Sequence, residues 1–325
     1  MLLHSFLTPS ALHLARSRMS YHGTVILPRQ RSAAFLIAFL LVAACPRICL
    51  AQLERAVDQA LGKAPGTVVV LDIASGKILA SRNLELAAKQ LIRPGSTLKP
   101  FVLEGLLSAN RIDSEQRLVC KRPLRIGSLR LDCSHAAEIK QLNAAEAIAY
   151  SCNSYVAETS VRLNEQELAE ALRRAGLDSP TGLVEREAVG HIEHTSTREQ
   201  LQLMALGLRG IEVTTLELLE AYRKLALQRP RDHEPRTAAI YKGLEDAVTY
   251  GTAHAAFVPG LKIAGKTGTA TNVGGAVTHG LFVGYTPAEH PEIAIVVYLD
   301  RSRGLDAAAV AQTVLARYKP TEQKP

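Results

Sequence analysis

The segment Arg93-Pro94-Gly95-Ser96-Thr97-Leu98-Lys99-Pro100-Phe101 decides the architecture of the chain. Pro94-Gly95 breaks the preceding segment, and apolar residues follow at helical spacing as far as Leu107. Pro100 is tolerated there, because the N–H groups of a helix's first turn have no intrahelical acceptor. The sequence therefore predicts a helix that begins at Ser96 and presents Ser96 and Lys99 on one face.

A serine and a lysine on one helix face can act as a nucleophile and its base. A neutral lysine amine can take the serine proton when burial lowers its pKa. At the helix start, the dipole and the free N–H groups favour developing negative charge. Taken alone, the pair is also explained by an ordinary helix cap beside a solvated lysine.

A Ser-x-Asn triplet occurs three times, at Ser81-Arg82-Asn83, Ser108-Ala109-Asn110 and Ser151-Cys152-Asn153. The first precedes Ser96, and the second lies on the same predicted helix, so it cannot fold over the serine. The third occupies a break between two predicted helices. A hydroxyl there can relay a proton, and an amide can orient the lysine or a substrate amide.

The segment Lys266-Thr267-Gly268-Thr269 has the pattern of a strand. Alternate side chains share a face, so Lys266 and Gly268 lie on one face and Thr267 and Thr269 on the other. A glycine there removes bulk where a ligand backbone can pass. A glycine-kinked strand without chemistry is the alternative interpretation.

Periodicity along the chain predicts an α+β fold. A mixed β-sheet is flanked by N- and C-terminal helices, and an all-α lobe at about residues 104–250 is inserted into it. Predicted helices cover residues 53–61, 101–107, most of 143–250, and 307–318; predicted strands cover residues 67–73, 77–81, 261–270, 278–285 and 292–300.

The charge of the chain is concentrated in its first residues. The 325 residues carry a formal net charge of +7, and five arginines but no acidic residue lie in residues 1–51, which leaves +2 for the rest. A nucleic-acid-binding protein keeps its positive charge on the folded body, so no nucleic-acid partner is predicted. Those arginines are Arg16, Arg18, Arg29, Arg31 and Arg47.

Residues 1–51 are interpreted as a signal peptide or membrane leader. The apolar run from Ala33 to Ala44 is too short to span a bilayer but suits the apolar region of a signal. Cleavage after Ala51, a lipoprotein site at Cys45 and an uncleaved anchor all remain open, as does translation from Met1 or Met19. Each interpretation exports residues 52–325 to the periplasm or the outer face of the cytoplasmic membrane, with the leader as the only membrane contact.

Three cysteines follow the leader, at Cys120, Cys133 and Cys152. Cys120 and Cys133 flank a short predicted hairpin or loop, and a disulfide between them suits an oxidising compartment; two free buried thiols are the alternative. The paired spacing of a zinc site is missing and the histidines are scattered, so no metal site is predicted.

Taken together and in order, Ser-x-x-Lys, Ser-x-Asn and Lys-Thr-Gly form the signature of serine enzymes that are acylated by penicillin. The surrounding residues make the chain resemble the transpeptidase domain of penicillin-binding proteins, from about Thr67 to Leu315. The segments that carry the resemblance are 68–72 with 76–80, 93–101, 149–153, 251–253, 264–270 and 282–287.

The resemblance implies a role for each matching residue and no cofactor. Ser96 is the acylated nucleophile and Lys99 its base; Ser151 shuttles protons, and Asn153 positions Lys99 and substrate. Lys266, Thr267 and Thr269 bind the substrate carboxylate beside Gly268, and the backbone N–H groups of Ser96 and Thr269 form the oxyanion hole. The implied substrates are the D-Ala-D-Ala ends of peptidoglycan stem peptides and, as inhibitors, β-lactams.

Larger family members carry an additional domain before this one, and residues 52–66 leave no room for it; a cell-wall synthesis protein is an expected partner. A D,D-carboxypeptidase, a serine β-lactamase and a non-catalytic β-lactam sensor are the alternatives to a transpeptidase. One β-lactamase class needs a Glu-x-x-Leu-Asn loop, which Glu185-Arg186-Glu187-Ala188-Val189 does not match. An unrelated structural protein is disfavoured by the three ordered motifs.

Overall fold

A computed structural model describes residues 50–229, 237–271 and 277–320. The predicted leader lies outside these residues, apart from Leu50 and Ala51, which begin a helix over residues 50–61. Among the helices in the described ranges, none has the length and apolar character needed to cross a membrane.

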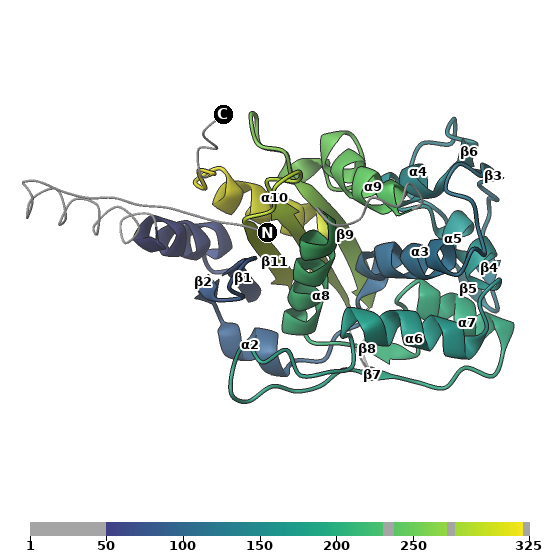
Figure 1. The fold of residues 1–325 in the computed structure, drawn as a ribbon, viewed down its shortest axis with the longest axis horizontal. Coiled ribbons are helices and arrows are strands. Elements are labelled where there is room, and N and C mark those ends of the chain that lie inside the picture. The colour runs from purple at the N-terminus through teal and green to yellow at the C-terminus, as the bar shows by residue number, and fades with distance from the viewer. Residues whose placement is uncertain (1–49, 230–236, 272–276, 321–325) are drawn as a thin grey trace, which may run out of the picture. The chain divides into compact units, whose positions relative to one another are not determined.

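A five-stranded antiparallel sheet forms the centre of the described fold (Figure 1). The strands follow one another across the sheet in the order β2-β1-β11-β10-β9, so the chain's first strands and last strands share one sheet. The bounds are β1 (Gly66–Asp72), β2 (Ile78–Arg82), β9 (Ala264–Thr271), β10 (Thr278–Thr286) and β11 (Ile293–Leu299). The predicted strands are confirmed within a few residues at their ends.

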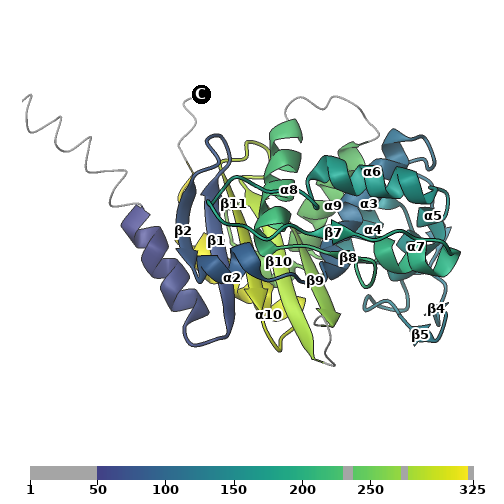
Figure 2. The same cartoon turned by 90° about the horizontal axis from the view of Figure 1, so that it is seen from below.

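The two faces of the sheet pack against different helices (Figure 2). Along β1, Val68 and Val70 belong to one apolar cluster and Val69 and Leu71 to another, because side chains alternate along a strand. The first cluster includes the helix of residues 50–61 and α10 (Gly304–Leu315). The second cluster contains residues of the sheet and of the inserted lobe, so the two share one core.

The inserted lobe is mainly helical but not all-α as predicted. Three two-stranded pairs interrupt it: β3 (Leu118–Val119) with β6 (Gln141–Leu142), β4 (Arg125–Ile126) with β5 (Leu129–Arg130), and β7 (His191–Ile192) with β8 (Ile211–Glu212). Pairs of two residues are too short for a period-2 pattern to be detected. The helices preceding and forming the lobe are α2 (Leu84–Lys89), α3 (Lys99–Ser108), α4 (Ala144–Ala149), α5 (Asn153–Ser160), α6 (Glu165–Ala175), α7 (Arg198–Ala205), α8 (Thr215–Gln228) and α9 (Ala238–Thr249).

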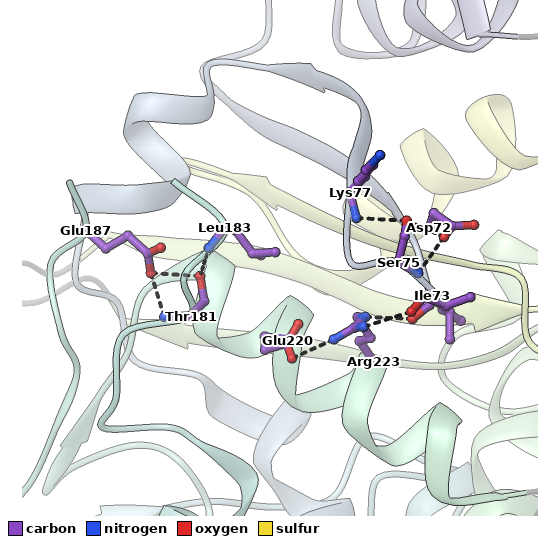
Figure 3. Close-up of polar contacts among 10 residues, drawn as sticks. Asp72, Ile73, Ser75, Lys77, Thr181, Leu183, Glu187, Glu220 and Arg223 are labelled. Carbon is purple, nitrogen blue, oxygen red and sulfur yellow. Dashed lines mark hydrogen bonds and ion pairs between the residues drawn. The ribbon is translucent and has the colours of Figure 1, made fainter. Parts of the chain in front are cut away.

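Helix α8 connects the lobe to the first hairpin of the sheet (Figure 3). The Arg223 guanidinium donates to the carbonyl of Ile73, at 2.7 Å, and pairs with Glu220 on its own helix. On the same helix, the Tyr222 hydroxyl donates to the carbonyl of Thr97. One helix therefore fixes both the β1–β2 turn and the segment that carries Ser96.

The predicted helix at Ser96 begins as a 3-10 turn, η1 (Gly95–Leu98), which continues directly into α3. Pro100 lies in the first turn of α3, as predicted. The backbone N–H of Lys99 donates to the carbonyl of Ser96. Side chains three positions apart are eclipsed in a 3-10 helix, so this turn aligns Ser96 with Lys99 more closely than an α-helix does.

The predicted break at Ser151-Cys152-Asn153 lies between α4 and α5. Cys152 N donates to Ala147 O and Ser151 N to Ile148 O, which are the two hydrogen bonds of a Schellman motif. Ser151 occupies the left-handed position of that motif with φ 53°, where glycine is usual. Backbone strain is therefore concentrated at Ser151.

This strain predicts that glycine stabilises the junction relative to alanine. Both Ser151→Gly and Ser151→Ala remove the hydroxyl, but only glycine relieves the left-handed conformation. We expect Ser151→Gly to exceed Ser151→Ala in free energy of unfolding by about 1 kcal/mol. Urea denaturation of the purified protein measures the difference, and an alanine variant that is at least as stable as the glycine variant contradicts the assignment.

Candidate active site

The three motifs meet at one cleft of about 240 Å³. Segment η1 contributes Ser96, the α4–α5 junction contributes Ser151 and Asn153, and the edge strand β9 contributes three consecutive residues. The lining residues are Ser96, Asp132, Ser134, Ser151, Asn153, Thr252, Thr267, Gly268 and Thr269. The fold therefore brings together all the predicted catalytic and substrate-binding residues: most of them line the cleft, and Lys99 and Lys266 lie buried behind its surface.

Lys99 is bound by the α4–α5 junction. Its Nζ atom lies 2.7 Å from the carbonyl oxygen of Ser151, 2.6 Å from Asn153 Oδ1 and 3.2 Å from Ser151 Oγ. Burial lowers the pKa of Lys99 to about 8. A substantial fraction of the amine is therefore neutral near physiological pH, which a proton acceptor requires.

Asn153 connects Lys99 to the loop that contains Leu131. While its Oδ1 atom accepts from Lys99, its Nδ2 atom donates to the carbonyl of Leu131 at 3.0 Å. One N–H of the amide remains available for a ligand in the cleft. The side chain thus aligns the amine and the cleft wall at the same time.

Ser96 is partly exposed at the floor of the cleft. It lies in the first turn of η1, where backbone N–H groups have no intrahelical acceptor. Two glycines let this turn approach β9. A Cβ on Gly268 would stand 2.8 Å from Pro94 O, and one on Gly95, whose φ is 54°, would stand 3.0 Å from Thr269 O.

The predicted reason for Gly268 is therefore incomplete. The glycine lines the cleft, as expected, but the missing side chain makes room for the protein's own Pro94 and Thr97 rather than only for a ligand. The alternation of a strand could not show this, because the contact is made with a segment distant in sequence.

On β9, Thr267, Gly268 and Thr269 line the cleft, whereas the Lys266 side chain is fully buried beneath it. Lys266 Nζ donates to the Thr267 carbonyl at 3.0 Å and lies 3.5 Å from Thr252 Oγ1. Burial, and next the positive charge of Lys99, lower the pKa of Lys266 well below its ordinary value. The structure places Lys266 behind the threonine hydroxyls rather than at the surface of the cleft.

Sequence reasoning missed Asp132 and Ser134 as cleft residues. Both neighbour Cys133 in the loop between β5 and β6. The Asp132 carboxylate accepts from Leu124 N at 2.8 Å and pairs with Arg130, and the Arg130 hydrogen bond is the main cause of its lowered pKa. This acid is therefore held ionised and hydrogen-bonded within its loop.

The loop that was compared with the β-lactamase Glu loop does not reach the cleft. Neither Glu185 nor Glu187 is among the described residues that line it. The Glu187 carboxylate instead accepts from the N–H and hydroxyl of Thr181, both at 2.7 Å (Figure 3). It also accepts from Val184 N. These hydrogen bonds hold the Glu187 carboxylate within its own loop.

Of the two alternatives for Cys120 and Cys133, the structure has the two free thiols rather than the disulfide. Both cysteines are free thiols, with sulfurs 3.5 Å apart rather than the about 2.05 Å of a disulfide bond. The sequence pattern correctly placed them close together. It did not show that Cys152 and His135 belong to the same cluster.

The chain that forms this cleft is similar to known proteins of one family. The family model of the penicillin-binding protein transpeptidase domain matches residues 66–317. The chain is 27% identical to the probable peptidoglycan D,D-transpeptidase PenA of Neisseria gonorrhoeae, over 77% of this chain and 49% of PenA. It is 24% identical to the peptidoglycan D,D-transpeptidase PbpA of Mycobacterium tuberculosis, over 83% of this chain and 68% of PbpA. The chain thus spans about half the length of the Neisseria relative.

Solved structures show the same fold. The transpeptidase domain of Burkholderia pseudomallei penicillin-binding protein 3 superposes with a TM-score of 0.71 at 22% identity, covering 85% of this chain and 93% of that one. The D,D-transpeptidase domain of an Eggerthella lenta peptidoglycan glycosyltransferase gives a TM-score of 0.68 at 21% identity, covering 82% and 80%. With the family model matching most of its length, the chain belongs to the penicillin-binding protein transpeptidase domain family.

Proposed function

We propose that this chain is a serine D,D-transpeptidase, acylated at Ser96 by the D-Ala-D-Ala end of a peptidoglycan stem peptide and, in the same way, by β-lactams. One observation carries the proposal: Lys99 is buried, one 3-10 turn from Ser96, and hydrogen-bonded to Ser151 and Asn153. A serine with a buried amine of lowered pKa beside it is an activated nucleophile.

In the first step, Ser96 Oγ attacks the carbonyl carbon between the two D-Ala residues. Neutral Lys99 takes the hydroxyl proton, since two of its N–H bonds go to Ser151 O and Asn153 Oδ1 and its lone pair stays free. The proton passes through Ser151 Oγ, 3.2 Å from Nζ, to the departing amine. The peptide bond breaks, an ester to Ser96 forms, and D-Ala leaves.

The backbone N–H groups of Ser96 and Thr269 donate to the oxyanion that forms in this step. Ser96 N–H is free of intrahelical bonding at the start of η1, and β9 is the edge strand of the sheet. The close approach of Gly95 and Gly268 brings these two backbones together. Such preorganised donors typically contribute about 3 kcal/mol to transition-state stabilisation.

The terminal carboxylate of the substrate binds at the threonine hydroxyls of β9. Thr267 Oγ1 and Thr252 Oγ1 are 3.3 Å apart, and Thr269 Oγ1 accepts from Gly304 N, which leaves its proton for a ligand. Lys266 lies behind Thr252 and Thr267 and adds positive charge from below the surface when it is protonated. We assign Lys266 to charge and positioning, and the threonines to direct contact.

In the second step, an amine of a neighbouring stem peptide attacks the ester carbonyl. The new amide bond forms the crosslink, the ester C–O bond breaks, and the proton lost by the amine returns through Ser151 and Lys99 to Ser96 Oγ. Among the described residues that line the cleft, Asp132 carries the carboxylate. This carboxylate is occupied by hydrogen bonds from the Leu124 N–H and from Arg130. This arrangement favours transfer to an amine over hydrolysis. We also propose that the leader directs export of the chain and that a cell-wall synthesis protein is its partner.

Acylation of Ser96 is tested directly with benzylpenicillin. We expect intact-mass analysis of the purified protein to show one added penicilloyl group, and peptide mapping to place it on the Ser96 peptide. Ser96→Ala should abolish the adduct. The control variant Ser108→Ala, at the end of α3, should retain it. A folded wild-type protein that stays unlabelled contradicts the proposal.

The lifetime of this adduct separates transpeptidase from β-lactamase. Because no described Glu reaches the cleft, we expect the penicilloyl-enzyme to persist for minutes or longer after free drug is removed. A time course of intact mass measures this lifetime. Loss of the adduct within seconds, with continued drug hydrolysis, favours the β-lactamase alternative.

The buried amine predicts a pH dependence of acylation. The pKa of Lys99 is lowered to about 8, so the neutral form increases as pH rises through that value. The second-order rate constant for benzylpenicillin should increase about tenfold per pH unit below about pH 7 and level off above about pH 9. Lys99→Arg should remove this acylation, with circular dichroism as a control for folding; a rate that is constant between about pH 6.5 and pH 9 contradicts the role of Lys99.

A further inference from the structure

A cluster of three cysteines and one histidine lies directly behind the cleft. Its members are Cys120, Cys133, His135 and Cys152, and their ligand atoms all lie within 4.8 Å of one another. Cys133, His135 and Cys152 are buried, and Cys120 is partly buried. The proposed reaction uses none of these side chains.

The spacing of these atoms matches the corners of a metal tetrahedron. Around a tetrahedral Zn²⁺ with Zn–S bonds of about 2.3 Å and a Zn–N bond of about 2.0 Å, two sulfurs are about 3.8 Å apart, and sulfur and nitrogen about 3.5 Å apart. In the structure, the three sulfur–sulfur distances are 3.5, 3.6 and 3.6 Å, and Cys120 Sγ lies 3.5 Å from His135 Nε2.

The surroundings of the cluster supply the second shell that zinc thiolates use. Backbone N–H groups of Ser154 and Tyr155 point at the sulfurs of Cys133 and Cys152, at 3.5 and 3.4 Å. His135 Nδ1 lies 3.0 Å from the carbonyl of Ala136. If Nδ1–H donates to that carbonyl, the Nε2 lone pair faces the sulfurs, which is the usual arrangement of a metal-binding histidine.

Charge supports the same interpretation. Three thiolates, a neutral imidazole and Zn²⁺ carry a net charge of −1. The guanidinium of Arg122 lies against the His135 ring, with Nη2 2.7 Å from Nδ1, 3.2 Å from Nε2 and 2.7 Å from the His135 carbonyl. Arg122 can only donate, so its contact with Nδ1 competes with the Ala136 carbonyl; we take the carbonyl contact as the bond and Arg122 as the compensating charge.

We propose that Cys120, Cys133, His135 and Cys152 bind one structural Zn²⁺ that holds the wall of the cleft in place. Cys133 lies between the cleft residues Asp132 and Ser134, and Cys152 lies between Ser151 and Asn153. Because each cysteine points away from the cleft to the cluster, one metal ion fixes both cleft-lining pairs. All four corners are occupied by protein ligands, as in zinc sites that stabilise structure rather than react.

The metal content of the purified protein tests the site itself. We expect elemental analysis of the full chain, purified without chelators, to give about one zinc per chain, and X-ray absorption to show sulfur neighbours at about 2.3 Å and one nitrogen neighbour. Cys133→Ser and His135→Gln should each weaken zinc binding by at least about tenfold. His191→Gln changes an exposed histidine outside the cluster and should retain the metal.

Cobalt reconstitution of the wild-type chain avoids variants that fail to fold. After zinc is removed with a chelator, Co²⁺ should produce the intense visible and charge-transfer absorption of a tetrahedral thiolate site. Absence of that absorption together with absence of zinc overturns the proposal. So does a disulfide in the purified protein, detected by counting free thiols after denaturation, or another metal in the stoichiometric amount.

The effect on the cleft rests on the proposed function and is measured separately. Removal of zinc should slow acylation of Ser96 by benzylpenicillin by at least about tenfold, and added zinc should restore the rate. An unchanged rate in zinc-free protein overturns the positioning role. If the proposed function is wrong, the zinc-loaded protein stays unlabelled while its zinc content remains about one per chain.

Discussion

The burial of the Lys99 amine is the constraint on which the rest of the cleft depends. An amine removed from water must find hydrogen-bond acceptors, or its burial costs several kcal/mol. All three acceptors of Lys99 come from Ser151 and Asn153. The left-handed backbone of Ser151 turns the chain between α4 and α5, and its carbonyl accepts one of these bonds. The strain at that residue is therefore part of what brings the serine hydroxyl and the lysine together.

The position of the cleft at a sheet edge follows from close backbone packing. β9 is the last strand of the sheet, and the turn that carries Ser96 packs against it where Gly95 and Gly268 leave no side chain. Tyr222 of α8 holds the same turn from the lobe through Thr97. The cleft therefore forms where the sheet, the turn Gly95–Leu98 and the lobe meet.

Local patterns were sufficient to predict the parts of the site that are local. The start of the helix at Ser96, the break at Ser151-Cys152-Asn153 and the strand at Lys266–Thr269 each depend on a few adjacent residues, and each is found in the structure. Patterns failed where a contact joins distant segments. The need for Gly268 arises from Pro94, and the β pairs of the lobe are too short to show a period. The cysteine cluster was missed because its four residues come from two segments without paired spacing.

The proposed zinc site also agrees with the proposed export of the chain. Three neighbouring thiols in an oxidising compartment cannot all pair, since one disulfide uses two and leaves the third reactive. In the structure the three sulfur atoms lie at nearly equal distances from one another, whereas a single disulfide needs only two of them to be close. A metal ion uses every thiol at once and protects each from oxidation. The proposed ion would also hold the α4–α5 junction through Cys152, which stands between the two residues that bind the Lys99 amine.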